Sequence, residues 1–402
     1  MRLSTSLIFT QGYDAIARQQ GELFRTQQQV ATGKRIVTPA DDPVGAARAQ
    51  ALTQSINEGE RYASNIAAAT SALAQNDTLL GQVGDLLQRV RTLAVNGGSG
   101  ALSAADRASL ATEVAGEAEQ LFALANSRDA AGKYLFAGLS LDTQPFAQTG
   151  TGVTYNGDQG RHELQVAASR TLPVNLDGSS VFMAGRNGDG NVLARAGAGN
   201  TGSGVVAQGS LAGTANGHSY TLTFTGAAQY DVAEYDAQGA LVGTTAGVAF
   251  TSGTSIAYGG MQTSITGTPA TGDTFTLGPA HAQDLVSTLA SLVATLKTPA
   301  TATGASTRVA NGIAAALQDL DQGIDNVLTL RATTGAQLRE LDTLTTATQA
   351  RSIQDQDSLS AIMDIDYNKA LADFARQQVA LQAAQQSFAK VNQLSLFDYL
   401  KL

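Results

Sequence analysis

The chain has 402 residues, of which 43% are hydrophobic, with a net charge of −9 and no cysteine. This length suffices for two or three domains with buried cores. The negative charge argues against a general nucleic-acid binder, and the absence of cysteine excludes disulfide frameworks and thiolate metal sites.

The first predicted helix covers residues 3–31. Its apolar residues recur every seven positions, which is the spacing of a coiled-coil seam. They are Ile16, Leu23 and Val30. Gly33 follows as a residue that commonly ends helices. An apolar stripe this narrow needs a partner helix, because exposure to water would forfeit its burial energy.

Two further helices are predicted over 43–96 and from Ser103 to about residue 126. Asp42 can cap the helix 43–96, and Pro43 suits its first turn, where no backbone N–H is needed. This helix carries the same seven-residue repeat. Its apolar positions are Leu52, Ile66, Leu73, Leu80, Leu87 and Ala94, with Val83 and Val90 at the complementary places.

Helical periodicity is absent between about residues 141 and 281. Short segments there alternate apolar and polar residues, as Tyr220–Phe224 does, and Asn-Gly and Asp-Gly turns separate them. The pattern predicts an all-β insert, a sandwich or a small barrel. The aromatic segment 133–138 before it is predicted to be a strand or hairpin arm. Residues 184–204, rich in Gly, Ala and Asn, are predicted to be a long flexible excursion.

Helix resumes over 282–297, 306–350 and 351–394, and the seven-residue repeat returns in the last two. Its positions are Ile313, Leu317, Leu320, Ile324, Val327, Leu338 and Leu341 in one, and Met363, Ala370, Phe374, Leu381, Ala384, Phe388 and Val391 in the other. The two ends of the chain can bury their stripes by packing together, with the middle looped out. We therefore expect an α+β multidomain fold: a long helical coiled-coil or bundle rod formed by the N- and C-terminal segments, with an inserted all-β domain.

Three domains are predicted. They are the terminal helices 1–42 plus 355–402, the helical rod 43–140 plus 282–354, and the inserted β domain 141–281. At about 1.5 Å per residue, the long helices would form rods of roughly 70–80 Å. That is longer than a compact domain requires, and it favours a protein that assembles over one that catalyses.

The outermost segments carry apolar residues on more than one stripe, since Phe9, Tyr13 and Phe24 supplement the repeat. A single copy cannot easily bury them all, so the ends are predicted to be assembly surfaces. The expected interface residues are Leu7, Ile16, Leu23, Val30, Phe374, Leu381, Phe388, Val391, Leu396 and Phe397.

No catalytic, cofactor-binding or metal-binding residue is predicted. Ser387 and Lys390 match a Ser-x-x-Lys pattern, but the partner motifs of that enzyme class are missing. The three histidines, His162, His218 and His281, occur singly, which argues against a transition-metal site. Residues 187–190, Asn-Gly-Asp-Gly, are reminiscent of a calcium-binding loop, but they lack the spaced acidic series and the closing Glu of an EF-hand.

Sequence blocks at both ends resemble the bacterial flagellin superfamily, and within it the hook-associated protein 3 family of hook–filament junction proteins. The blocks are Met1–Thr5, Thr32–Ile36 with Pro39–Pro43, Leu102–Arg107, Asn126–Ser127 with Gly132–Gly138, Asn326–Ala332, and Leu381–Ala384 through Leu394–Phe397. Flagellin, the filament subunit, is the alternative. Its counterpart of Pro39–Pro43 has a Lys-Asp-Asp-Ala character and its end is of a Leu-Leu-Arg type, and this chain departs from both.

The resemblance implies a non-catalytic structural adaptor that joins the hook to the flagellin filament. It implies a ring of subunits, with one face on the preceding hook-associated protein and the other templating flagellin. It also implies an extracellular location reached by flagellar type III export, which fits the lack of a signal-peptide core and cleavage site in residues 1–9. A cytoplasmic export chaperone is expected on the C-terminal helix. No cofactor, nucleic acid or membrane is expected as a partner. The remaining alternatives are an enzyme or glycan-binding module in the insert, and a coiled-coil tip protein of another secretion system.

Overall fold

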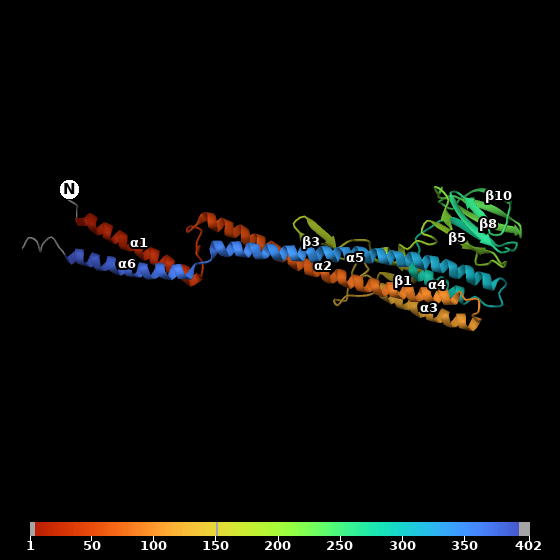
Figure 1. Ribbon diagram of the computed structural model, residues 1–402, viewed down its shortest axis with the longest axis horizontal. Coiled ribbons are helices and arrows are strands. Elements are labelled where there is room, and N and C mark those ends of the chain that lie inside the picture. Colours follow the sequence, from red (N-terminus) through yellow and green to blue (C-terminus); the bar gives the residue numbers. More distant parts are fainter. Residues whose placement is uncertain (1–4, 150–151, 394–402) are drawn as a thin grey trace, which may run out of the picture. The chain divides into compact units, whose positions relative to one another are not determined.

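The computed structural model describes residues 5–149 and 152–393, which form long helices and a set of short strands (Figure 1). The described parts of the chain make up two compact units. Unit 1 comes from Met1–Asn65 and Thr343–Leu402, and unit 2 from Ile66–Asp342. The fold is the expected α+β fold, with terminal helical segments and an inserted β region. The predicted boundaries between terminal helices, rod and insert stay a prediction.

Six α-helices are found within the described ranges. They are α1 Thr5–Thr32, α2 Pro43–Gly97, α3 Ala104–Ala125, α4 Leu285–Leu296, α5 Ala305–Met363 and α6 Tyr367–Gln393. Ser103 and Asp106 start α3 with reciprocal side-chain-to-backbone hydrogen bonds of 3.1 and 3.2 Å, a capping box. The predicted interruption near residue 350 is wrong, because no Gly or Pro breaks the helix there and α5 continues to Met363.

The helices of unit 2 share one apolar core, and the residues of the seven-residue repeat are its centre. Leu80, Leu87 and Val90 of α2 are fully buried, as are Leu320 and Val327 of α5. Helix α4 packs against α3 and contributes Leu285, Leu289, Leu292 and Leu296 to the same core. The prediction that segments far apart in sequence bury their stripes together is confirmed in this unit.

Thirteen strands are described in the insert of unit 2. They are β1 Phe146–Thr149, β2 Gly152–Tyr155, β3 Glu163–Ala167, β4 Arg170–Pro173, β5 Val192–Ala196, β6 Val205–Val206, β7 Ser210–Leu211, β8 Ser219–Gly226, β9 Gln229–Tyr235, β10 Leu241–Ala249, β11 Ser255–Tyr258, β12 Met261–Thr266 and β13 Thr274–Pro279. One sheet has the order β10-β9-β8-β13-β5, and a second has β11-β12-β6 with β7 on β12. The hairpins β1–β2 and β3–β4 stand apart from both sheets.

The two larger sheets enclose a second apolar core. Phe224 lies at its centre, with ring centroids 4.9 Å from Phe250 and 5.6 Å from Phe275. Met261 and Ile265 of β12 close it from the smaller sheet. The alternation of apolar and polar residues that predicted strands here reflects this one buried face.

Two local predictions in this region are wrong. Residues 133–138 are not a hairpin arm but lie in turns, with isolated bridges at Arg128–Tyr134 and Ala137–Asp177. Residues 184–204 are not one flexible excursion, because β5 lies within them and pairs with β13. The glycines there form tight turns, with φ of 67° at Gly188 and 88° at Gly190, values that favour glycine.

Candidate assembly interface

Helices α1 and α6 lie side by side and antiparallel in unit 1 (Figure 1). Near the N-terminal end of α1, the rings of Phe9 and Phe388 meet edge to face at 5.7 Å. Just beyond the other end of α1, the backbones of Lys34 and Asp364 form an isolated antiparallel β-bridge. The N-terminal helix α1 and the C-terminal helix α6 therefore pack against each other, as the sequence repeat predicts.

The seam between the two helices is built from positions alternately four and three residues apart. Positions with this spacing are partly or fully buried on both helices: Gly12, Ile16, Gln19, Leu23, Thr26 and Val30 on α1, and Ala370, Phe374, Gln377, Leu381, Ala384 and Phe388 on α6. A Cβ at Gly12 would lie 2.7 Å from the Phe388 ring, so this close approach requires glycine. Such 4-3 spacing is the pattern of coiled-coil packing.

Six of the ten predicted interface residues thus lie in the seam of one copy. They are Ile16, Leu23, Val30, Phe374, Leu381 and Phe388. Leu7 is exposed on α1. Val391 lies in the last turn of α6, but its side chain is outside the described residues, and Leu396 and Phe397 lie outside them altogether. Whether these residues meet a neighbouring molecule stays a prediction.

Other large apolar side chains on the same two helices point away from the seam. They are Tyr13 and Phe24 on α1, and Tyr367, Leu371 and Val379 on α6, all exposed; Phe9 is exposed as well, but its ring packs on Phe388 of the seam. At about 100° per residue, Tyr13 and Phe24 lie on one flank of α1, roughly 100° around the helix from the seam. Large apolar side chains left exposed on one helix pair are a feature of interaction surfaces. Tyr367, Leu371 and Val379 are not among the residues predicted from the sequence, because an apolar residue outside the repeat is their only signal.

The core of unit 1 is thin. Among the described residues of this unit, the buried apolar side chains are Ile36, Ala49 and Ala370. The Gln377 side-chain oxygen is enclosed in the seam and accepts no hydrogen bond from the described residues. Enclosing a polar atom without a partner costs free energy. The helix pair is therefore weakly stabilised in a single copy, and it leaves large apolar side chains exposed.

The connections α1–α2 and α5–α6 are tied together by backbone hydrogen bonds. Gly33 ends α1 with φ 70°, and its carbonyl accepts from Ile365 N at 3.0 Å. Arg35 N donates to Met363 O at 2.6 Å, and the Arg35 guanidinium donates to Ile362 O at 2.8 Å. These bonds hold the end of α1 next to the start of α6.

The segment Pro39–Pro43 owes its composition to the loop it forms. Asp41 accepts from the backbone N–H groups of Val37 and Thr38 at 3.1 and 2.8 Å, and it also pairs with Arg25. The Thr38 N–H in particular holds the pKa of Asp41 below its usual value. Asp42 caps α2 by accepting from Gly45 N at 2.8 Å, as the sequence predicts.

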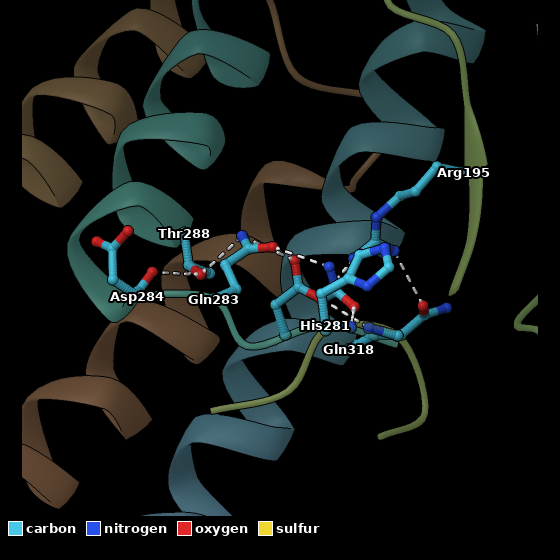
Figure 2. Close-up of polar contacts among 9 residues, drawn as sticks. Arg195, His281, Gln283, Asp284, Thr288 and Gln318 are labelled. Atoms are coloured by element: carbon cyan, nitrogen blue, oxygen red, sulfur yellow. Dashed lines mark hydrogen bonds and ion pairs between the residues drawn. The ribbon is translucent and has the colours of Figure 1, made fainter. Parts of the chain in front are cut away.

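In unit 2, a buried polar cluster joins strand β5 to helix α5 (Figure 2). Asp319 is 7% exposed and accepts hydrogen bonds from the Arg195 guanidinium and from Gly188 N, the latter at 3.0 Å. Arg195 also donates to Gln318 Oε1 at 3.1 Å. Burial raises the pKa of Asp319, against the opposing charge of Arg195. The groups neutralise one another, so the cluster holds the insert onto the helices and presents no free nucleophile.

The remaining candidates for chemistry are dispersed. His218 Nδ1 lies 2.7 Å from Glu234 Oε1 on the sheet surface, and His281 is exposed. Ser387 and Lys390 are exposed on α6. Over residues 5–149 and 152–393, no cluster of three His, Cys, Asp or Glu side chains is arranged to hold a metal ion. Within the same ranges, none of the helices combines the length and hydropathy that crossing a bilayer requires.

Comparison with known proteins adds a second line of evidence. The family described as the bacterial flagellin N-terminal helical region matches residues 3–140. The crystal structure of Xanthomonas campestris FlgL is 34% identical and covers 73% of this chain and 98% of that one, with a TM-score of 0.65. The flagellar hook-associated protein-3 structure from Legionella pneumophila is 26% identical, covers 78% and 98%, and has a TM-score of 0.69. The flagellar hook-associated protein 3 of Escherichia coli K12 is 28% identical over the full length of both chains.

Proposed function

The chain belongs to the FlgL family of flagellar hook-associated proteins, and from this premise we propose that it is the structural adaptor between the flagellar hook and the flagellin filament. The relatives that align over its whole length carry the name hook-associated protein 3 and not flagellin, which favours a junction over a filament subunit. A related solved chain is named a flagellar junction protein.

The observation that carries the mechanism is the combination of a thin core and exposed apolar side chains on α1 and α6. A helix pair with Tyr13 and Phe24 in water gains burial energy when neighbouring subunits cover them. We propose that copies form a ring in which the terminal helices order fully only on contact with neighbours. Assembly is then confined to the growing tip.

The two faces of the ring would contact different partners, the preceding hook-associated protein on one side and flagellin on the other. Before export through the flagellar type III apparatus, a chaperone would cover the C-terminal helix, whose exposed Leu371 and Val379 are poorly suited to water. The protein would then act outside the cell, without a cleaved signal peptide.

We further propose that the protein is not an enzyme. This is supported by the pairing of the buried carboxylate of Asp319 with Arg195, and by the separation of the three histidines. Incubation of the full chain with glycan and peptide substrates should give no turnover. Reproducible turnover that Asp319→Asn or Glu234→Gln abolishes would contradict this proposal.

Gene deletion followed by complementation tests the junction role. Without the protein, cells should export flagellin but lose it to the medium, because no template retains it at the hook. The full chain should restore attached filaments, whereas a chain lacking residues 363–402 should stay soluble and folded but fail. Filament growth supported by the truncated chain would refute the role given to the terminal helices.

A further inference from the structure

A cavity of about 360 Å³ lies in unit 1 beside the loop that follows α1. Val37 and Pro39 of the loop, Ala46 of α2, and Leu359 and Met363 of α5 give it apolar walls. Lys34, Asp364 and Gln50 form a polar rim. An apolar hollow with a polar margin is the usual shape of a pocket that receives an apolar anchor residue at an interface.

The walls of this cavity are set in place before any partner arrives. Asp41 accepts two backbone hydrogen bonds from the wall segment at Val37 and Thr38. Arg35 N is bonded to the carbonyl of Met363, at the end of the opposite wall. Gly45 leaves no room for a side chain, because a Cβ there would lie 2.6 Å from Ile36 Cδ1. A pocket that needs no rearrangement binds at a lower entropic cost.

Phe24 is the matching anchor. Its side chain is wholly apolar and 68% exposed, so it does not fill the cavity of its own copy. The two other exposed aromatic residues of α1 differ. Phe9 already packs on the Phe388 ring, and Tyr13 carries a hydroxyl whose burial in an apolar cavity would cost free energy. Phe24 is therefore the ring on this helix that gains most from being covered.

The positions of anchor and cavity also specify the kind of interface. Phe24 and the cavity are different places on the same unit, so their contact joins unlike surfaces of two identical chains. A heterologous contact of this kind generates rings or helical arrays, whereas a symmetric dimer uses the same patch twice. A ring at the junction, as proposed above, requires an interface of the heterologous type.

We propose that Phe24 of one copy inserts into the cavity between Val37 and Met363 of a second copy, and that this contact closes the subunit ring. The inference rests on the proposed junction function and names the contact between its subunits. It defines a specific pair of surfaces, so it can fail while the junction function stands.

Photo-crosslinking tests the contact directly. The benzophenone amino acid p-benzoylphenylalanine, placed at position 24, keeps an aromatic anchor and reacts readily with C–H bonds beside a methionine sulfur. The chain has four methionines, of which Met363 lines the cavity. In flagella isolated from illuminated cells, we expect a covalent dimer in which the peptide containing residue 24 is joined to the peptide containing Met363. The same label at the equally exposed Tyr13 should not give this pair.

A second experiment works even if the label disturbs assembly. Ala46→Phe fills the cavity with an aromatic ring from the same copy. Ala47→Phe adds the same ring one residue away, on the exposed side of α2. Loss of one anchor contact predicts a fall of about tenfold or more in attached filaments for Ala46→Phe. Ala47→Phe should match the natural chain.

Three outcomes would overturn the inference. They are equal filament numbers for the two variants, a crosslink from residue 24 to flagellin or to the preceding hook-associated protein, and a dimer joined at a peptide outside the cavity. None of these outcomes would contradict the junction function, which the deletion and truncation experiments test separately.

Discussion

At the residue scale, the environment of a side chain decides its importance more than its chemical type does. Asp319 and Asp321 lie two residues apart on α5, and each pairs with an arginine, Arg195 and Arg91 respectively. The Asp319 side chain is 7% exposed and that of Asp321 is 47% exposed. Water screens an exposed pair, whereas removing one partner of a buried pair leaves an uncompensated charge.

Asp319→Ala should therefore lower the free energy of unfolding by about 3 kcal/mol, at the low end for buried pairs because Arg195 keeps some contact with water. Urea denaturation of the variant measures the loss. Asp321→Ala, its matched control, should leave the urea midpoint nearly unchanged. Equal losses for the two variants would show that burial does not govern the strength of this pair.

Tyr155 predicts how stability changes in alkali. Burial raises the pKa of Tyr155 from 10.0 to about 12, and its hydroxyl donates to the Asp158 carbonyl at 2.7 Å. In the unfolded chain the phenol ionises first, so the stabilisation is complete below about pH 10 and is lost as the pH rises toward 12. Urea midpoints should fall over this range, and less steeply in Tyr155→Phe. The exposed Tyr13→Phe should keep the slope of the natural chain; an unchanged slope in Tyr155→Phe would contradict the assignment.

At the element scale, the seven-residue repeat was the most informative feature of the sequence, because its period survives in the structure. It predicted the buried Leu80, Leu87 and Leu320, and it predicted that α1 and α6 would pair. The exposed Tyr367 and Leu371 of α6 could not be predicted in the same way, since they follow no repeat. The Arg195–Asp319 pair also left no signal, because its members are 124 residues apart and each looks like an ordinary surface residue.

The seam of α1 and α6 can be broken without touching the outer surface. Leu381→Glu puts a charge into the seam, and burying an unpaired charge is costly, so the pair should open. Gln378→Glu adds the same side chain at an exposed position of α6 and serves as the control. Hydrogen exchange should speed up across α1 and α6 in the seam variant alone, and only that variant should lose attached filaments. Unchanged exchange in Leu381→Glu would mean that the seam does not hold the helices together.

At the scale of the whole molecule, stabilising contacts are distributed unevenly. Unit 2 contains both apolar cores, with many fully buried side chains such as Leu73, Phe136 and Phe224. Among the described residues of unit 1, only Ile36, Ala49 and Ala370 are buried apolar side chains. Regions with little burial open at low free energy, and elements that order on assembly are drawn from them.

This imbalance predicts that unit 2 is stable without unit 1. A fragment covering Ile66–Asp342 should keep the main thermal transition of the full chain, because both cores lie inside it. In the full chain, amides of α1 and α6 should exchange far faster than those of α3, and this difference should vanish in isolated flagella, where neighbours cover the exposed apolar side chains. If the fragment melted well below the full chain, the terminal helices would contribute to the stability of the single molecule. A role as segments that neighbouring subunits complete would then be untenable.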